Sequence, residues 1–270
     1  MMAQTYPWKA IARSVIGSGH QEQKIPCQDY SQYQLLEAGN IIIGAVADGA
    51  GSAFLSHVGA EIAVKSALAY LQQWHDFCQR HASFSPSELS EPQLTHFFSK
   101  LVQRIQRTLA QQSQLLNCPL SALATTLLVF AANQEGAIAM QIGDGFLLVR
   151  PKGEDYQLLF RPDKGEFINE TTFVTSATAL DFLQVSICPK PLEFICAATD
   201  GLEKVAIKYS DWSPFPPFFK PLEAFLQETP DPEAEADYLE QFLNSERLNH
   251  RTQDDKTLLL CLSACKRSGG

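Results

Sequence analysis

Apolar residues in the first 47 positions form short runs rather than helical stripes. Three runs, at residues 8–16, 29–36 and 41–47, are rich in apolar and β-branched side chains, a composition typical of strands. The run at 41–47 is apolar throughout, as expected for a strand that is buried on both faces. The pattern therefore predicts three strands, of which the third lies in the interior.

Two long helices are predicted next. At about 56–77 the polar positions fall within one narrow sector at helical spacing, so this helix is expected to be largely buried. The second helix begins with the capping-box pattern Ser90-Glu91-Pro92-Gln93. Its apolar stripe repeats at helical spacing through Leu94, Phe98, Leu101, Ile105 and Leu109. The polar residues 78–89 are expected to form the loop between these helices.

From residue 123 the pattern changes to short β runs, followed by further helices. Strands are predicted at 123–131, 137–142, 146–150, 156–160, 171–175, 182–187, 192–199 and 257–262. Helical patterns are found at 201–207, 218–227 and 234–244, and three prolines indicate an irregular surface segment at 208–217. Two helices within a long series of strands favour α+β layers over alternating βαβ units.

The composition is that of a globular protein. The chain has 270 residues, of which 45% are hydrophobic and 19% charged, so it is neither disordered nor collagen-like. No Gly/Ser-rich linker or block of charge divides it. We therefore expect residues 1–270 to form a single domain.

Charge and cysteine content restrict the partners and the compartment. The 21 Lys and Arg against 30 Asp and Glu give a net charge of −9, which disfavours nucleic acid and anionic membranes as partners. The most apolar stretch, 122–132, is too short to span a bilayer, and the N-terminal residues lack the features of a signal peptide. The 7 cysteines, without a CxxC pair, suit a reducing compartment. We expect a soluble, cytoplasmic protein with no nucleic-acid or membrane partner.

Four aspartates occupy similar places at the ends of predicted strands. Asp48, Asp144 and Asp200 each follow an apolar run and precede a glycine, and Asp254 lies just before the last strand. A carboxylate at the end of a strand is held by a rigid element yet faces a loop cleft. The glycine that follows lets the backbone turn sharply, and its carbonyl can approach a cation.

Converging carboxylates repel one another unless a cation neutralises them. All-oxygen ligation suits Mg2+ or Mn2+ rather than Zn2+ or copper. Two such ions can share a carboxylate and a water, and so generate a hydroxide near neutral pH. A structural alternative remains, because Asp-Gly at a strand end is also a common hairpin signal, and Asp144-Gly145 fits a hairpin as well as a ligand site.

Six motifs extend over nearly the whole chain, from about residue 16 to residue 262. They are Pro26-Cys27-Gln28-Asp29, Val46-Ala47-Asp48-Gly49-Ala50-Gly51-Ser52, Ala124-Thr125-Thr126-Leu127, Ile142-Gly143-Asp144-Gly145, Ala198-Thr199-Asp200-Gly201-Leu202-Glu203 and Asp254-Asp255-Lys256-Thr257. In this order, with the helix pair between the second and the third, they resemble the metal-dependent protein phosphatases of type 2C. The details are most similar to a bacterial branch of that family.

The resemblance implies a four-layer α-β-β-α sandwich with two central, mainly antiparallel sheets and a metal cluster at one edge. Asp48 resembles the carboxylate that bridges two Mg2+ or Mn2+ ions, with the Gly49 carbonyl on one of them. Asp200 and Asp254 resemble the remaining carboxylate ligands. Asp144 resembles the residue that, with Asp200, binds a third ion in bacterial members, so two or three ions are expected.

Further positions are implied around these ligands. Lys24 stands where an Arg often holds the substrate phosphate. Asp29 matches an acidic residue that holds metal-bound water, and Gln28 and Asp255 are expected behind the metal ligands.

Three positions depart from the family pattern. Gln28 stands where many members have Glu, so a charge is lost although an amide oxygen can still accept a hydrogen bond. Lys24 supplies a point charge but not the bidentate fork of Arg. Ala50 stands where some members have a His that protonates the leaving group, so that role is empty unless His20 or His57 reaches the site.

The implied reaction is hydrolysis of phosphoserine or phosphothreonine in proteins, in which a metal-activated water attacks phosphorus directly without a covalent enzyme intermediate. The partner would be a phosphorylated protein, and the enzyme would oppose a Ser/Thr kinase. The departures keep a second hypothesis open, a catalytically weak or inactive phosphoprotein-binding or regulatory module on the same fold. A third, a hydrolase for a small phosphorylated metabolite, would have a deep closed pocket rather than an open cleft.

Overall fold

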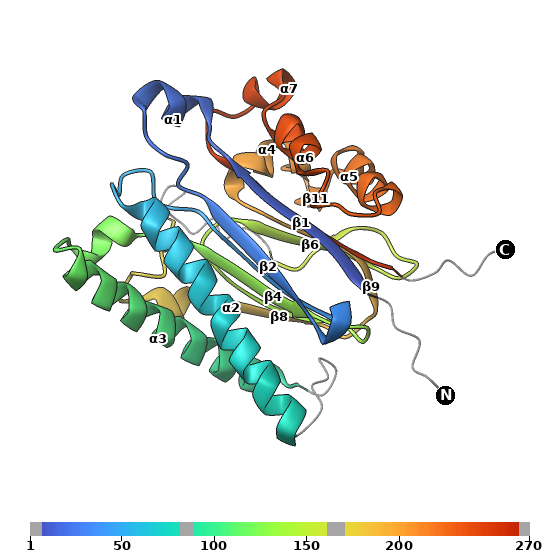
Figure 1. The fold of residues 1–270 in the computed structure, drawn as a ribbon, viewed down its shortest axis with the longest axis horizontal. Coiled ribbons are helices and arrows are strands. Elements are labelled where there is room, and N and C mark those ends of the chain that lie inside the picture. Colours follow the sequence, from blue (N-terminus) through green and yellow to red (C-terminus); the bar gives the residue numbers. More distant parts are fainter. Residues whose placement is uncertain (1–6, 82–88, 161–170, 265–270) are drawn as a thin grey trace.

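Two five-stranded antiparallel sheets form the centre of the molecule (Figure 1). The structure is a computed structural model that describes residues 7–81, 89–160 and 171–264. The first sheet has the order β2 (Tyr30–Leu36), β3 (Ile41–Ala47), β4 (Leu127–Ala132), β5 (Ala137–Ile142) and β8 (Gln184–Cys188). The second has the order β1 (Trp8–Val15), β12 (Lys256–Ser263), β9 (Leu192–Ala198), β6 (Phe146–Pro151) and β7 (Gln157–Leu158).

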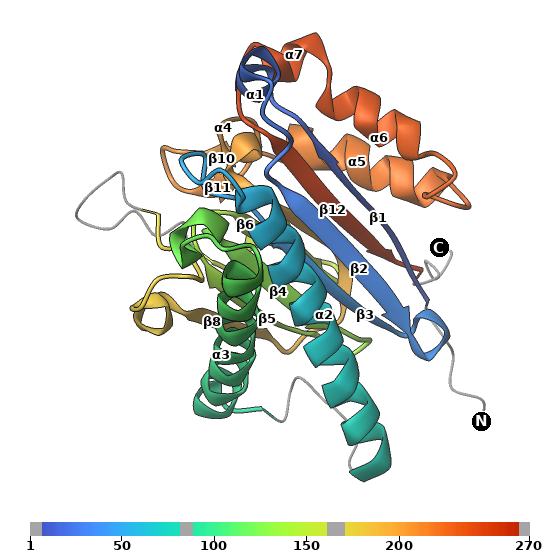
Figure 2. The ribbon, with the colours of Figure 1, turned by 60° about the vertical axis from the view of Figure 1, so that its left-hand side comes forward.

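Helices cover the outer face of each sheet. The helices α2 (Ser56–His81) and α3 (Glu91–Leu115) lie along the first sheet, and α5 (Pro216–Glu228) and α6 (Ala236–Leu243) lie along the second (Figures 1 and 2). The predicted capping box is present at the start of α3, where the Ser90 N–H donates to Gln93 Oε1 at 3.0 Å. None of the helices in the described ranges is long and apolar enough to cross a membrane.

Burial on both faces explains why the central strands β3 and β4 are apolar throughout. In β3, Ile43 and Ala45 face α2 and α3, whereas Ile42 and Val46 pack against the second sheet. Because side chains alternate along a strand, a strand between a helix layer and another sheet has no face left for polar residues. The predicted α-β-β-α sandwich of antiparallel sheets is therefore confirmed.

Several predicted boundaries were wrong. Strand β4 begins only at residue 127, because the preceding Leu120–Leu123 form a 3-10 helix. The predicted strand 156–160 is reduced to the two residues of β7, and the described residues 171–175 form no strand. Val174 makes a backbone hydrogen bond of 2.8 Å to the Thr125 carbonyl but belongs to no ladder.

The remaining differences concern short elements. Helix α2 extends to His81, so the first residues of the predicted loop 78–89 are helical. The segment predicted as irregular contains the small hairpin β10 (Ile207–Lys208) and β11 (Ser213–Pro214). The short helices α1 (Ser18–Gln23) and α7 (Glu246–Asn249) have too few residues to show a periodic pattern, and α4 (Glu203–Ala206) follows a 3-10 turn at Asp200–Leu202.

The strand register brings the aspartate-bearing ends together. Within the first sheet, Leu127 at the start of β4 lies opposite Ile142 at the end of β5. Within the second, Ala198 at the end of β9 lies opposite both Leu258 of β12 and Phe146 of β6. The loops after β3, β5 and β9 and before β12 therefore emerge at one end of the sandwich.

Candidate metal centre

A cavity of about 170 Å³ lies at this end of the two sheets. All four aspartates that were predicted from strand ends line it: Asp48, Asp144, Asp200 and Asp254. Gly49, Gln28 and His20 contribute to its wall, and no Lys or Arg is among the described residues that line it. The cavity is thus a cluster of carboxyl groups without a balancing basic side chain other than a histidine.

Asp48 is fixed by its own backbone. Its N–H donates to Thr126 Oγ1 at 2.9 Å, and its carbonyl accepts from the Thr126 N–H at 2.8 Å and from Thr125 Oγ1 at 2.9 Å. The next N–H, of Gly49, donates to the Gln28 carbonyl at 3.1 Å. A Cβ on Gly49 would lie 2.7 Å from that same carbonyl oxygen, so only glycine fits. The Asp-Gly pair places a carboxyl group at a rigid strand end.

The other aspartates are positioned by different contacts. The side chains of Asp200 and Asp48 share a hydrogen bond. Thr171 Oγ1 donates to Asp144 Oδ2 at 2.7 Å, and the exposed Asp254 accepts the N–H of Asp255 through Oδ1 at 2.9 Å. Asp144-Gly145 joins β5 to β6, and Asp144 also lines the cavity, so it is both a turn residue and a candidate ligand.

Burial and mutual repulsion raise the pKa values of two of these groups. The pKa of Asp200 rises to about 7, first because of burial and then because of the charges of Asp144 and Asp254. The pKa of Asp48 is raised well above its usual range by burial and by the charges of Asp29 and Asp200. A carboxyl group whose charged form is disfavoured in this way holds a proton, and that proton makes the Asp48–Asp200 hydrogen bond possible.

The donors present fit a hard divalent cation. Asp200 Oδ1 and Gln28 Oε1 are both buried and have no hydrogen-bond partner. Among the described residues, no group of three or more His, Cys, Asp or Glu side chains is already arranged as it would be around an ion. Asp48 and Asp200 contact each other instead, and a cation can take the place of their shared proton once these side chains rotate. Carboxylate, carbonyl and amide oxygens are the ligands that Mg2+ and Mn2+ prefer.

Comparison with known proteins identifies the family. Residues 16–244 match the family "Protein phosphatase 2C". "Serine/threonine-protein phosphatase 3" of Escherichia coli (strain K12) is 33% identical over 264 residues, which cover 95% of this chain and 99% of that protein. The chain belongs to the protein phosphatase 2C family. It is accordingly a metal-dependent phosphoprotein phosphatase, and the resemblance read from the six motifs is confirmed.

Solved structures of low sequence identity share the fold. The S. agalactiae serine/threonine phosphatase matches with a TM-score of 0.61 and 16% identity over 94% of this chain and 99% of that chain. RsbX in complex with magnesium matches with a TM-score of 0.53 and 14% identity over 97% of this chain and 98% of that chain.

Asp255 holds both ends of the segment that carries α1. Its buried carboxylate accepts the N–H of Gly17 at 2.7 Å and that of Gln28 at 2.6 Å, the two ends of the segment that contains α1. His20 Nδ1, on α1, lies 3.0 Å from the same Asp255 oxygen as the Gly17 N–H. Asp255 does not line the cavity, so it acts by positioning the residues that do.

Two histidines were considered for the proton-donor role that Ala50 cannot fill, and the structure distinguishes between them. His20 lies in α1 with a side chain that is only 16% exposed, and it lines the cavity. His57, on α2, is not among the lining residues. The short helix was missed because six residues with one histidine show no periodicity.

Two further predicted residues lie outside the cavity wall. Asp29 is buried and accepts hydrogen bonds from Thr199 Oγ1 at 2.8 Å and Thr257 Oγ1 at 2.7 Å, and burial together with the charge of Asp255 raises its pKa well above the usual range. Lys24 is exposed at the C-terminal end of α1.

Lys256 is a residue that the sequence analysis did not single out. Its side chain is fully buried, and its Nζ donates to Asn249 Oδ1 of α7 at 2.9 Å. Burial lowers its pKa, while the charges of Asp255 and Asp254 oppose that shift. In the sequence, only its position directly after two aspartates sets Lys256 apart. An exposed lysine can occupy the same position, so the sequence does not indicate that this one is buried.

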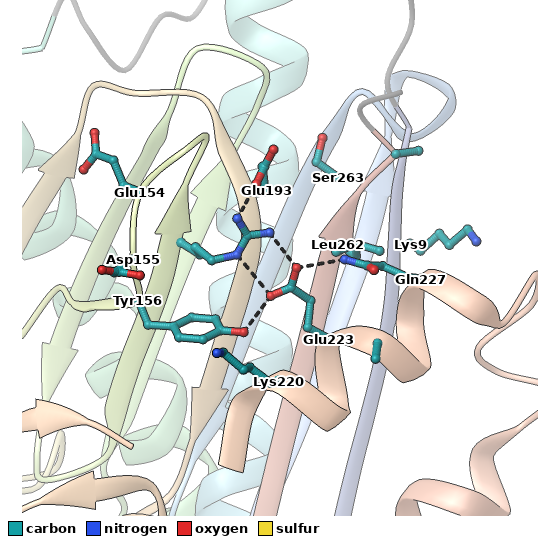
Figure 3. A pocket seen from close by; sticks show the side chains of 13 residues that line it. Lys9, Glu154, Asp155, Tyr156, Glu193, Lys220, Glu223, Gln227, Leu262 and Ser263 are labelled. Carbon is teal, nitrogen blue, oxygen red and sulfur yellow. Dashed lines mark hydrogen bonds and ion pairs between the residues drawn. The ribbon is translucent and has the colours of Figure 1, made fainter. Parts of the chain in front are cut away.

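A larger cavity, of about 620 Å³, lies between β6, β9 and α5 and includes none of the four aspartates (Figure 3). Arg150 forms ion pairs with Glu193 and Glu223 there. Figure 3 shows that Tyr156 and Gln227 also donate hydrogen bonds to Glu223. Here Arg150 balances two carboxylates, whereas no Lys or Arg is among the described residues that line the aspartate cavity.

Proposed function

We propose that this phosphatase hydrolyses phosphoserine and phosphothreonine in proteins by direct attack of an activated water at a binuclear Mg2+ or Mn2+ centre. The observation that carries the proposal is the convergence of Asp48, Asp144, Asp200 and Asp254 on one cavity with no Lys or Arg among its described lining residues. The named E. coli relative supports the choice of serine and threonine, and the magnesium complex of RsbX supports a hard divalent ion.

Each aspartate has a proposed role at the metal centre. Asp48, Asp200, Asp254 and the Gly49 carbonyl would hold the ions, and Asp144 with Asp200 would hold a third. When bound, the ions would neutralise the phosphoryl oxygens and lower the pKa of a water molecule. The chain's own contribution is to fix the carboxylates at strand ends, so that they need little reorganisation during the reaction.

Other residues would act on the substrate and on water. His20 is the residue placed to protonate the departing serine or threonine oxygen, because it lines the cavity and its Nδ1 lies 3.0 Å from Asp255 Oδ1. Gln28 offers a buried amide oxygen to an ordered water, and Asp29 supports the same wall from behind through Thr199 and Thr257. Lys24, exposed directly after the short helix that carries His20, remains our proposed contact to the substrate phosphate.

The size of the cavity favours a protein substrate over a metabolite. Pockets that enclose a small molecule measure about 300–1,000 Å³. At about 170 Å³ this cavity is smaller, which suits a phosphoryl group whose attached chain stays outside. A non-catalytic module is not favoured, since four clustered carboxyl groups serve no purpose in binding a phosphate anion. We place the enzyme in the cytoplasm, opposite a Ser/Thr kinase.

The test is phosphate release from a phosphothreonine peptide, with and without Mn2+, by the wild type and by Asp200→Ala. The matched control is Asp237→Ala, which removes an exposed aspartate from α6. We expect Mn2+-dependent turnover in the wild type and the control and none in Asp200→Ala. Turnover that persists in Asp200→Ala, or that ignores Mn2+, would contradict the proposal.

A further inference from the structure

A second charged region is built from residues that lie close to the aspartates along the chain. It is a groove of about 450 Å³ between α4, α5, α6 and α7. Four basic residues line it, namely Lys204, Lys208, Arg247 and Arg251, and no Asp or Glu is among the described residues that do so. We call it the cationic groove. This local positive charge contrasts with the net charge of −9 of the whole chain.

The basic side chains of the groove are exposed. Hydrogen bonds from Ser213 lower the pKa of Asp211, and the charge of Lys208 contributes to that shift. In the described part of the chain, none of the four forms an ion pair with a carboxylate, although Lys208 lies over the ring of Phe215 with its Nζ 6.0 Å from the ring centroid. The cavity of Figure 3 differs, because there Arg150 is held by Glu193 and Glu223.

The floor of the groove is apolar. Phe215 and Phe242 are partly buried there, and Ile207, Phe218 and Leu248 are buried beneath them. Aromatic and aliphatic groups with a charged rim are the usual anatomy of a protein-binding surface, in which an apolar anchor supplies affinity and the rim supplies selectivity.

The groove adjoins the proposed metal centre along the chain. Lys204 is four residues beyond Asp200, and Arg251 is three residues before Asp254. Both figures place α4 and α7 at the end of the sandwich that also carries α1 and His20 (Figures 1 and 2). A substrate whose phosphoryl group enters the aspartate cavity therefore has its flanking residues within reach of the groove.

We propose that the cationic groove binds an acidic segment with at least one large apolar side chain, carried by the substrate protein beside its phosphorylated residue. The proposal rests on the proposed function, since it assigns the segment to the substrate. Complementary charge is its main argument: the molecule as a whole repels an acidic partner, whereas these four cations attract one locally over a Debye length of about 8 Å. The same net charge disfavours nucleic acid, whose longer backbone would meet the acidic surface around the groove.

The first experiment measures binding without chemistry. Two fluorescent peptides that lack phosphate are compared by anisotropy: one contains Glu, Asp, Phe and Leu, and in the other Gln and Asn replace the acids. The groove variant is Lys208→Glu/Arg247→Glu, and the matched control is Lys100→Glu/Arg107→Glu on the exposed side of α3. We expect the wild type to prefer the acidic peptide, and the groove variant alone to bind it about tenfold more weakly.

The second experiment measures turnover of phosphothreonine peptides that carry the same two flanks, with p-nitrophenyl phosphate as a substrate that cannot reach the groove. The groove variant should have a KM for the acidic-flank peptide that is about tenfold higher, with kcat unchanged. Its turnover of the neutral-flank peptide and of p-nitrophenyl phosphate should equal that of the wild type. Equal affinity of the wild type for both peptides, or equal loss in the groove and control variants, would overturn the groove assignment. Tighter groove-dependent binding of a single-stranded oligonucleotide would overturn it as well.

The two experiments distinguish the failure of each proposal. If every phosphorylated substrate is turned over without peptide selectivity, the proposed phosphatase function is supported and the proposed role of the cationic groove is contradicted. If the acidic peptide binds selectively but no substrate is turned over, the proposed function is contradicted. The assignment of the acidic segment to a substrate is then contradicted as well.

Discussion

The aspartate cavity and the cationic groove carry opposite charges near the same end of the molecule, and they differ in how those charges are held. The four carboxyl groups of the cavity lie at strand ends or in the adjoining loops, and two of them are pressed into contact with raised pKa values. The four cations of the groove lie on short helices, on a hairpin and in the turn after α7, where each is exposed to water.

The difference shows why the two regions need different partners. Partly buried like charges cost folding free energy until a cation neutralises them, so the cavity requires an ion to reach its active form. Exposed charges cost little folding free energy when they are unpaired. The groove therefore needs no permanent partner and can bind a transient one. In our proposal the aspartate cavity performs the chemistry and the cationic groove selects the protein on which the enzyme acts.

The largest expected effect comes from replacing Asp48 by Asn. Loss of the bridging carboxylate should reduce turnover about a thousandfold, equivalent to the several kcal/mol that a metal contributes. The metal-free protein should melt at a higher temperature, by about 2–4 °C for each kcal/mol of relieved repulsion, because an amide donates to Asp200 without a shared proton. Turnover and thermal melting in chelator measure both effects. Activity within about threefold of wild type would contradict the role of Asp48.

The next effect concerns pH and metal together. The folded pKa of Asp200 is about 7 and that of Asp48 is also raised, whereas an unfolded aspartate titrates near 4. Between these pH values the metal-free folded state therefore binds more protons than the unfolded state. The contribution of these groups to the free energy of unfolding is fully present below about pH 4 and is lost as pH rises through about 7. Mn2+ competes with these protons, so its stabilising effect should grow over the same range.

Melting curves from pH 5 to pH 8, with chelator or with millimolar Mn2+, check this dependence. We expect Mn2+ to raise the melting temperature by about 4 °C or more at pH 8 and by much less at pH 5. Asp48→Asn should reduce this difference. A shift by Mn2+ that is equal at both pH values would show that the carboxyl groups of the cavity are not its site.

A smaller effect is expected at the loop that closes the cavity. Asp255→Ala leaves the N–H groups of Gly17 and Gln28 without an acceptor, which should cost about 3 kcal/mol of unfolding free energy. Asp255→Asn keeps one acceptor oxygen and should cost less. Urea denaturation gives the free energies, and hydrogen exchange at the two amides shows whether the loss is local. Unaltered protection of both amides in Asp255→Ala would rule out this positioning role.

The smallest change is expected from the two histidines, as a matched pair. His20→Gln should lower kcat for a phosphothreonine peptide about 100-fold, and should affect p-nitrophenyl phosphate less because its leaving group needs no proton. His57→Gln, which alters a residue outside the cavity wall, should change neither. The pH–rate profile of each variant completes the measurement, and identical profiles for His20→Gln and the wild type would exclude His20 as proton donor.

The sequence predicted the cavity well because its residues follow strands. An apolar run that ends in Asp-Gly indicates both the strand and the place of the carboxyl group, so Asp48 and Asp200 could be predicted without the structure. The contacts of His20 and Asp255 could not, since 235 positions separate them along the chain and only the pairing of β1 with β12 brings them together.

The groove was hidden from sequence analysis for the same physical reason. Lys204 and Lys208 lie on one side of α5 in the sequence and Arg247 and Arg251 on the other, and each alone is an ordinary solvated side chain. No Asp or Glu is among the described residues that line the groove, and this follows from the fold rather than from the order of residues along the chain. The strand predicted at 171–175 was wrong because alternation alone does not supply a partner strand.

The measurement that tests the central claim most directly is calorimetric titration of the metal-free protein with Mn2+ at pH 8. The account predicts about two ions bound per chain, with release of protons from the cavity, and loss of this binding in Asp48→Asn and Asp200→Ala but not in Asp237→Ala. No heat of binding at millimolar Mn2+, or binding that all three variants retain, would contradict it.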